Sequence, residues 1–257
     1  MLRTSAGVTD VGRRREVNED AFFLDDSLGL YIVADGMGGH ASGEIASAEA
    51  VDAVRGMVWQ GVGALHRVEQ GDRSEEALQT AARLLESAVQ AATYMVFGLA
   101  QHDPKQQGMG TTLSSLALCG DIGITAQVGD SRIYVVRNGV AAPLTEDHTL
   151  VAWQLKQGII TEEEAAVSPH KNVITRAVGS REYVQVDTNI FEAHSGDVFL
   201  LCSDGLHGYV EDHEIGPIVD LGPRLAVKRF VELANDRGGR DNITAVAVEV
   251  RSSPSRF

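Results

Sequence analysis

Positive charge is scarce in this sequence, and that scarcity excludes one class of function. Of the 257 residues, 22 are Lys or Arg and 36 are Asp or Glu, which gives a formal net charge of −14 at pH 7. A protein that binds along DNA or RNA needs a cationic surface to displace counterions from the phosphates, and this chain has no excess of cations. We therefore expect no nucleic-acid partner.

Long hydrophobic runs and a cysteine framework are also missing. The longest apolar stretches, such as Val198–Cys202, are far shorter than the roughly 18 residues of a membrane-spanning helix, and residues 1–7 contain no apolar signal-peptide core. The two cysteines, Cys119 and Cys202, both lie in apolar runs, which indicates buried reduced thiols. These features predict a cytoplasmic protein that does not contact a membrane.

The remaining composition is that of a folded globular chain, with 44% hydrophobic and 23% charged residues. No linker and no internal repeat divides the sequence, so we expect one domain over residues 1–257. Apolar runs predict strands at Arg3–Thr9, Ala21–Leu24, Gly29–Ala34, Thr111–Leu118, Ile122–Val128, Arg132–Arg137, Val184–Glu192, Val198–Cys202 and Ile243–Val250. Helical periodicity predicts helices at Ser42–Gln60, Ser74–His102, His148–Gln157, Glu162–Ala166 and Arg224–Asp236, and Gly61–Arg73 and Ser252–Phe257 are expected to be irregular. Because strands and helices do not alternate regularly, the pattern favours an α+β fold with sheet packed on sheet and helices outside.

Acidic residues stand where the predicted strands end. They are Glu19-Asp20, Asp35-Gly36, Asp130, Asp204-Gly205 and Asp241-Asn242. Each pair alone could be an ordinary turn. Carboxylates gathered from several strand ends, however, repel one another and raise one another's pKa unless cations lie among them. Hard oxygen ligands of this kind suit Mg²⁺ or Mn²⁺, so the residues predict a carboxylate-bridged two-metal hydrolase.

Eight short motifs then occur in an order that resembles the bacterial metal-dependent Ser/Thr protein phosphatases, the protein phosphatase 2C family. They are Gly12–Asp20, Ala34–His40, Gly108–Thr112, Val128–Arg132, Leu144–His148, Asn172–Gly179, Ser203–Leu206 and Asp241–Thr244. The resemblance spans nearly the whole chain. It implies a four-layer α-β-β-α sandwich, in which two antiparallel sheets are flanked by helices and the metals lie at one end.

The resemblance also implies a ligand set. Asp35 bridges two Mn²⁺ or Mg²⁺ ions, and Glu19 and the carbonyl of Gly36 complete one of them. Asp204 and Asp241 hold the other ion, and Asp20 orients metal-bound water or binds weakly. A third ion at Asp130 and Asp204 is left open, because this chain has Gly208 where the family often has an acidic or amide side chain.

The implied chemistry is phosphate-ester hydrolysis. Two ions lower the pKa of a bridging water, which attacks phosphorus in line and releases the seryl or threonyl oxygen. We expect the guanidinium of Arg15 to bind the substrate phosphate, with a solvated surface charge as the alternative. Met37 occupies the position where animal members carry His, so the general acid is a metal-bound water or a nearby side chain such as His40. His148 is expected to be structural.

Partners and alternatives follow from the same resemblance. We expect a monomeric bacterial signalling enzyme that acts on phosphorylated proteins, either the substrates of a Hanks-type Ser/Thr kinase or the kinase itself. Residues 145–179 resemble the family's flap, with Leu150, Trp153, Leu155 and Ile159 forming a small amphipathic unit. The alternatives are a catalytically silent pseudophosphatase that binds phosphoproteins and a phosphoesterase that acts on small molecules.

Overall fold

Two antiparallel sheets form the centre of the molecule, which is a computed structural model that describes residues 1–38 and 42–252. The first sheet has the strand order β1 (Leu2–Asp10), β11 (Ile243–Arg251), β10 (Val198–Cys202), β7 (Arg132–Arg137) and β8 (Val140–Pro143). The second has the order β2 (Asp20–Asp25), β3 (Leu30–Met37), β5 (Leu113–Cys119), β6 (Ile122–Val128) and β9 (Asp187–Glu192), and the short β4 (Gly110–Thr111) pairs with β3.

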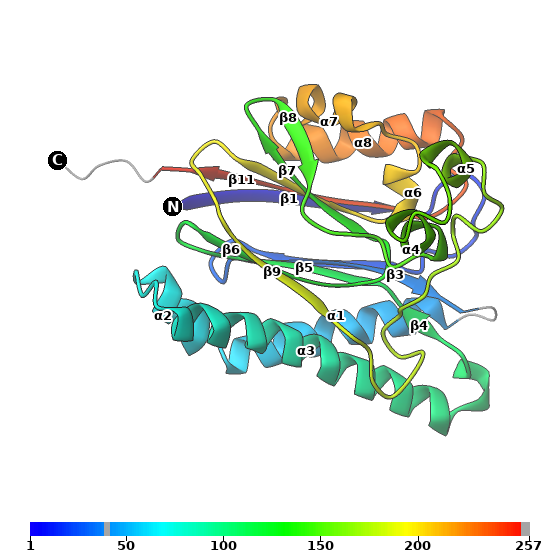
Figure 1. Cartoon of the computed structure of the whole chain (residues 1–257), viewed down its shortest axis with the longest axis horizontal. Coiled ribbons are helices and arrows are strands. Elements are labelled where there is room, and N and C mark those ends of the chain that lie inside the picture. Colours follow the sequence, from blue (N-terminus) through cyan, green and yellow to red (C-terminus); the bar gives the residue numbers. More distant parts are fainter. Residues whose placement is uncertain (39–41, 253–257) are drawn as a thin grey trace.

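Helices cover the outer faces of both sheets (Figure 1). The second sheet packs against α1 (Gly43–Gln60), α2 (Gly63–Glu69) and α3 (Glu75–His102), which is followed by the 3₁₀ turn η1 (Pro104–Gln106). The first sheet packs against α6 (Asp204–His207), α7 (Asp212–Val219) and α8 (Pro223–Asp236). The predicted α-β-β-α sandwich is therefore confirmed.

Three clusters of buried apolar side chains fill the spaces between the two sheets and the two layers of helices. Alternation along β3 shows how: Tyr31 and Val33 pack against the first sheet, whereas Leu30 and Ile32 pack against the helices, and all four are fully buried. Successive side chains of a strand point to opposite faces, so a strand covered on both faces reads as one continuous apolar run. This explains why the central strands were recognisable in the sequence.

Most predicted elements agree with the structure to within a few residues, and Ile122–Val128, Arg132–Arg137, Val198–Cys202 and Glu162–Ala166 agree at both ends. The predicted strand Thr111–Leu118 is interrupted at Thr112, whose N–H donates to the carbonyl of Asp35 at 2.9 Å. The cysteines are buried and free, as expected. In the described part of the chain, no helix combines the length and apolar character that a membrane span requires.

The prediction that Gly61–Arg73 is irregular was wrong, because this segment contains α2. Its buried Leu65 and Val68 lie three residues apart and close the hydrophobic core beside α3. Strand β8 and helices α6 and α7 were also missed. Strand β8 is the second arm of the hairpin that the turn at Asn138-Gly139 forms, where both residues have positive φ.

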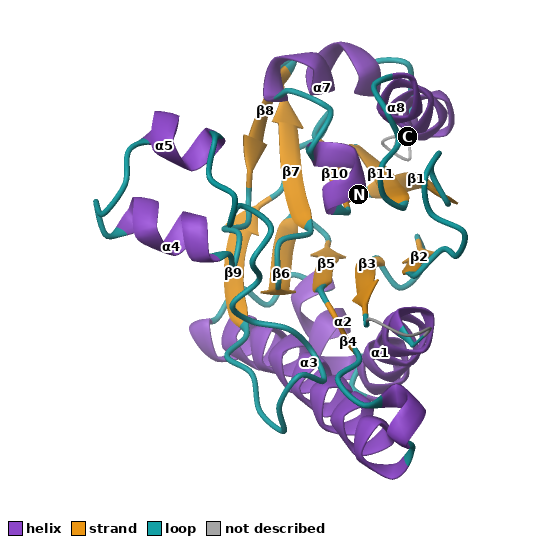
Figure 2. Cartoon of the chain, turned by 90° about the vertical axis from the view of Figure 1, so that its right-hand side faces the viewer, coloured by secondary structure: helices purple, strands orange, loops and turns teal. Residues whose placement is uncertain are grey.

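The flap contains α4 (Leu150–Lys156) and α5 (Glu162–Ala166), which project from the body of the molecule (Figure 2). The prediction that it packs as an amphipathic unit was wrong. Trp153 is 53% exposed and Ile159 is 57% exposed, and Val151 is the buried residue of α4. Two helices of this length are too small to bury an apolar face between them.

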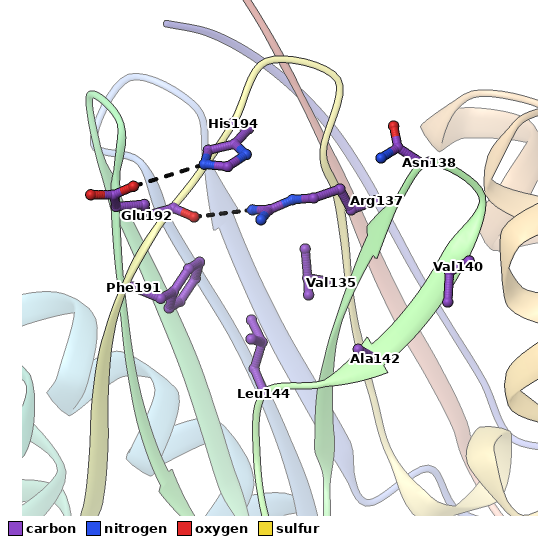
Figure 3. A pocket seen from close by; sticks show the side chains of 9 residues that line it. All are labelled: Val135, Arg137, Asn138, Val140, Ala142, Leu144, Phe191, Glu192 and His194. Atoms are coloured by element: carbon purple, nitrogen blue, oxygen red, sulfur yellow. Dashed lines mark hydrogen bonds and ion pairs between the residues drawn. The ribbon is translucent and has the colours of Figure 1, made fainter.

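The edge strands β8 and β9 border a pocket whose lining side chains are drawn in Figure 3. A cavity of about 550 Å³ lies there, with Val135, Leu144 and Phe191 among its apolar lining. Arg137, at the end of β7, donates 2.8 Å hydrogen bonds to both carboxylate oxygens of Asp197 and a 3.1 Å hydrogen bond to the carbonyl of Glu192 in β9. The Asp197 side chain is 1% exposed, and Asp197 directly precedes β10, the neighbour of β7, so this bidentate pair lies within the first sheet. The hydrogen bond to Glu192 of β9 is the contact of Arg137 that reaches the second sheet.

Candidate metal centre

The acidic residues singled out from the sequence lie at one end of the sandwich, where β2 begins, β3 ends and α6 begins. This end of the strands faces the viewer in Figure 2. Asp20 and Asp35 are direct cross-strand partners in the β2–β3 hairpin. Asp204 begins α6 two residues after the end of β10, and Asp241 lies two residues before the start of β11, the neighbour of β10. Antiparallel pairing thus brings together carboxylates that are far apart in the sequence.

Asp20 is one of the buried carboxylates of this group. Its Oδ2 accepts hydrogen bonds from the hydroxyls of Ser203 at 2.8 Å and Thr244 at 2.6 Å, whereas its buried Oδ1 has no hydrogen-bond partner. Burial raises the pKa of Asp20 to about 6 against the effect of the two hydroxyls, and the carboxylates of Asp204 and Asp241 add to the rise. A buried acceptor without a partner is costly, and a bound cation is one group that would satisfy it.

Asp35 occupies the middle of the cluster. Burial first, and then the charges of Asp20, Asp204 and Asp130, hold the pKa of its carboxyl well above the ordinary value. Its backbone is fixed, because its N–H donates to Thr112 Oγ1 at 2.9 Å and its carbonyl accepts from Thr111 Oγ1 at 2.8 Å. Hydrogen bonds to the backbone of Asp35 therefore keep this residue in place although its carboxylate is repelled by the neighbouring acids.

Gly36 lies where three segments meet. A Cβ atom at this position would lie 2.2 Å from the carbonyl oxygen of Gly43 and 2.5 Å from that of Glu19, so no side chain fits. The Gly36 N–H donates to the Glu19 carbonyl at 3.1 Å, and burial raises the pKa of the Glu19 side chain. Glu19 and Gly36, which were predicted to share one ion, are thus neighbours.

Asn242 links the other predicted ligands to this part of the site, and sequence reasoning missed it. Its side chain donates to the carbonyls of Val11 at 3.1 Å and Val17 at 3.0 Å and accepts from the N–H of Glu19 at 2.8 Å. The residue is buried, so it fixes the loop before β2 against the start of β11. Ser203 and Thr244 were missed as well, although all three lie inside the motifs that carry the predicted carboxylates.

Arg15 lies at the rim of the cluster. Its guanidinium donates to Asp241 Oδ2 at 2.8 Å, and its side chain is 48% exposed. The hydrogen bond to Asp241 raises the pKa of Arg15, so the group is a permanent cation beside four acids. A guanidinium in this position can bind a phosphate that enters the cluster from solvent.

Asp130 follows β6, and its carbonyl is hydrogen-bonded to Nε2 of His207 at 3.0 Å. Burial raises the pKa of the Asp130 carboxyl to about 7, and the neighbouring Asp204 contributes. Gly208 ends α6 and supplies no side chain. The structure therefore brings Asp130 towards Asp204 but adds no further acid from α6.

Of the two histidines considered from the sequence, His40 lies outside the described residues. His148 is buried, accepts from the Gly129 N–H through Nδ1 at 3.1 Å and lies 3.1 Å from Asp187 through Nε2. Both ring nitrogens are therefore engaged within the fold, which supports the structural role predicted for it.

The donor set fits hard divalent cations. It consists of carboxylates and one backbone carbonyl, and such oxygens suit Mg²⁺ or Mn²⁺. In the part of the chain that the structure describes, no three Asp, Glu, His or Cys side chains are placed to hold a metal ion by themselves. Ions of this kind keep several water ligands, so an open group of acids beside a cleft is compatible with them.

These pKa shifts predict how stability without added metal depends on pH. A carboxyl with a raised pKa binds more protons in the folded chain, so its contribution is complete below about pH 4 and is lost as the pH rises through the folded pKa. Between pH 8 and 6.5, Asp130, whose pKa burial raises to about 7, takes up a proton in the folded state, and the raised pKa of Asp35 acts in the same direction. We expect the free energy of unfolding in EDTA to increase on the order of 1–2 kcal/mol over this change.

Urea titrations at several pH values in EDTA would measure this effect. Below about pH 6.5 we expect the gain to level off, because burial lowers the pKa of His207 to about 4 and also lowers that of His148. Those histidines stay neutral in the folded chain while the unfolded chain takes up protons. Stability that is constant or falls between pH 8 and 6.5 would contradict the predicted repulsion.

Comparison with known proteins adds independent findings. A sequence model of the family described as "Protein phosphatase 2C" matches residues 11–243. The chain is 38% identical over 246 residues to "Serine/threonine phosphatase stp" of Listeria monocytogenes, with 94% of this chain and 93% of the relative covered. It is 39% identical over 248 residues to "Protein phosphatase PhpP" of Streptococcus pneumoniae, with 95% and 96% covered.

Solved structures agree with the sequence relatives. The serine/threonine phosphatase PstP/Ppp of Mycobacterium tuberculosis superposes with a TM-score of 0.85 at 32% identity, with 98% of this chain and 100% of that chain covered. The catalytic domain of the serine threonine protein phosphatase PstP, solved in complex with two manganese ions, gives a TM-score of 0.80 at 30% identity, with 98% and 99% covered.

Proposed function

Since the chain belongs to the protein phosphatase 2C family, we propose that it is a metal-dependent protein phosphatase that hydrolyses phosphoserine and phosphothreonine. One observation supports this most directly. Asp20, Asp35, Asp204 and Asp241 converge from distant segments, and the carboxyl of Asp20 leaves a buried oxygen without a partner. A cluster that repels itself in this way is expected where divalent cations bind.

We assign Asp35 to both of two ions, Mn²⁺ or Mg²⁺. Glu19 and the Gly36 carbonyl would hold the first ion, and Asp204 and Asp241 the second. When bound, such a pair activates water as a nucleophile and screens the charge of the phosphate. Asp130 and Asp204 would hold a third ion if one binds.

Other residues of the chain complete the site and bind the substrate phosphate. Asp20, held by the hydroxyls of Ser203 and Thr244, leaves its buried Oδ1 without a partner and available to an ion or a water molecule in the site. Arg15 binds the phosphate oxygens, because its guanidinium is a permanent cation that is half exposed and held by Asp241. Met37 has no proton to give to the leaving group, so we assign that proton to water in the cleft.

Phosphate release from a phosphothreonine peptide tests the proposal. We expect turnover that requires Mn²⁺ or Mg²⁺, stops with EDTA and returns when metal is restored in excess. Turnover that persists in EDTA would contradict the metal mechanism. Peptide binding without release of phosphate would favour the silent pseudophosphatase, and release from small phosphate esters alone would favour the small-molecule enzyme.

Metal should also stabilise the folded chain, because ions bind the assembled carboxylates and not the unfolded chain. One site at 100 times its dissociation constant contributes about 2.7 kcal/mol to the free energy of unfolding. The natural partners are proposed to be phosphorylated proteins, including those modified by a Hanks-type kinase.

A further inference from the structure

A cleft of about 410 Å³ extends from the proposed metal centre between the flap and α6. Asp130, Asp204 and Asp241 line its acidic part. Lys171 of the flap also lines the cleft, as does Arg240, which immediately precedes Asp241. A peptide whose phosphorylated residue lies over the carboxylates must therefore place its neighbouring residues in the same cleft.

Lys171 and Arg240 are the cations of this cleft that have no internal partner. Both are exposed, and neither forms an ion pair with any residue that the structure describes. Nearby cations behave differently: Arg132 makes a bidentate pair with Asp147, and Arg237 makes one with Glu214. Two cations are thus left for an external anion.

The backbone of both residues is anchored. The N–H of Arg240 donates to the hydroxyl of Tyr209 at 3.1 Å, and the carbonyl of the preceding Gly239 accepts from the N–H of Arg13 at 2.7 Å. In the flap, the N–H of Val173 donates to the carbonyl of His170 at 3.0 Å, which closes a turn around Lys171. The backbone of Lys171 and of Arg240 is therefore held in place beside the cleft, and a ligand has to order only the two side chains.

We propose that Lys171 and Arg240 form a subsite for acidic side chains that flank the phosphorylated residue, and that the enzyme selects phosphosites with neighbouring Asp or Glu. The inference rests on the proposed function, because that function places the phosphorylated residue over the carboxylates. The net charge of −14 repels acidic peptides in general, so local cations are needed to accept them. Exposed ion pairs are individually weak, and two of them predict a preference of about three- to tenfold in kcat/KM.

The experiment compares two phosphothreonine peptides that differ in having either Glu or Gln on both sides of the phosphorylated residue. With saturating Mn²⁺, we expect wild type to prefer the Glu peptide, and Lys171→Glu/Arg240→Glu to prefer the Gln peptide. The matched control is Arg224→Glu/Lys228→Glu, which makes the same charge change on the exposed surface of α8 and should keep the wild-type ratio. The preference should weaken as salt is raised from 0.05 to about 0.5 M, because screening shortens the reach of exposed charges.

An unchanged ratio in Lys171→Glu/Arg240→Glu would overturn the inference. So would an equal loss with both peptides, because it would assign these cations to the phosphate itself. If neither peptide is hydrolysed, the proposed function fails, and binding of the same peptides by fluorescence anisotropy still decides the subsite. The Glu peptide must then bind more tightly to wild type, and lose that advantage in the double variant.

Discussion

Replacing Asp35 by Asn is expected to lower kcat/KM for a phosphothreonine peptide by roughly a thousandfold or more. The substitution keeps the size of the side chain but removes the charge that we assign to both ions. Metal ions supply several kcal/mol of transition-state stabilisation, and each 1.4 kcal/mol corresponds to about a factor of ten in rate. Initial rates over a range of Mn²⁺ concentrations would measure the loss and show whether excess metal restores activity.

The same variant should have the opposite effect on the metal-free protein. Because Asp35 is repelled by Asp20, Asp204 and Asp130, its neutral replacement relieves that repulsion and should raise the melting temperature in EDTA. Saturating Mn²⁺ should then raise the melting temperature less than it does in wild type. Asp52→Asn is the matched control, because Asp52 is exposed on α1. Asp35→Asn with more than about a tenth of wild-type activity would contradict the shared-ligand assignment.

Replacing Arg15 by Ala is expected to lower kcat/KM by about 10- to 100-fold. Hydrogen bonds to a charged group contribute about 1.5–3 kcal/mol each, and Arg15 is placed to donate such bonds to the phosphate. Because the guanidinium also donates to Asp241 at 2.8 Å, we expect a smaller change in Mn²⁺ affinity, which calorimetry would report separately. Arg15→Lys should recover part of the loss, because an ammonium group keeps the charge without the planar pair of donors.

Arg14→Ala provides the control for Arg15, because it removes the same charge from an adjacent exposed residue. Its kcat/KM should stay within about a factor of two of wild type. Equal losses in Arg14→Ala and Arg15→Ala would show that the basic run acts through long-range attraction and that Arg15 has no specific contact with the phosphate.

The sequence was sufficient to predict the strands of the central sheets and the acidic residues at the ends of those strands. Strands such as β3 and β10 are covered on both faces, so they read as uninterrupted apolar runs, and each one leads directly into an aspartate. Antiparallel pairing then has few ways to arrange these ends, which is why Asp20 and Asp35 lie opposite each other. The roles given to individual carboxylates came from the family resemblance and not from the pattern.

Features that depend on contacts distant in the sequence could not be predicted. Helix α2 begins at a glycine, Gly63, and is stabilised by the core into which Leu65 and Val68 pack. The bridge from Arg137 to Asp197 joins residues that are 60 positions apart, and nothing local marks them as partners. In the flap, the helical spacing was real, but no apolar surface is available to cover Trp153 and Ile159.

The hydrogen bonds around Asp20 have a consequence for when the site can form during synthesis of the chain. Thr244, which is 224 positions further along the chain, and Ser203, which is 183 positions further, supply the hydroxyls that hold this carboxylate. A chain that ends before Asp241 lacks the carboxylate of Asp241, the hydroxyl of Thr244 and β11, which is the neighbour of β1. We therefore expect enzymatic competence to arise only once β11 has joined its sheet, so that a chain lacking this strand should release no phosphate.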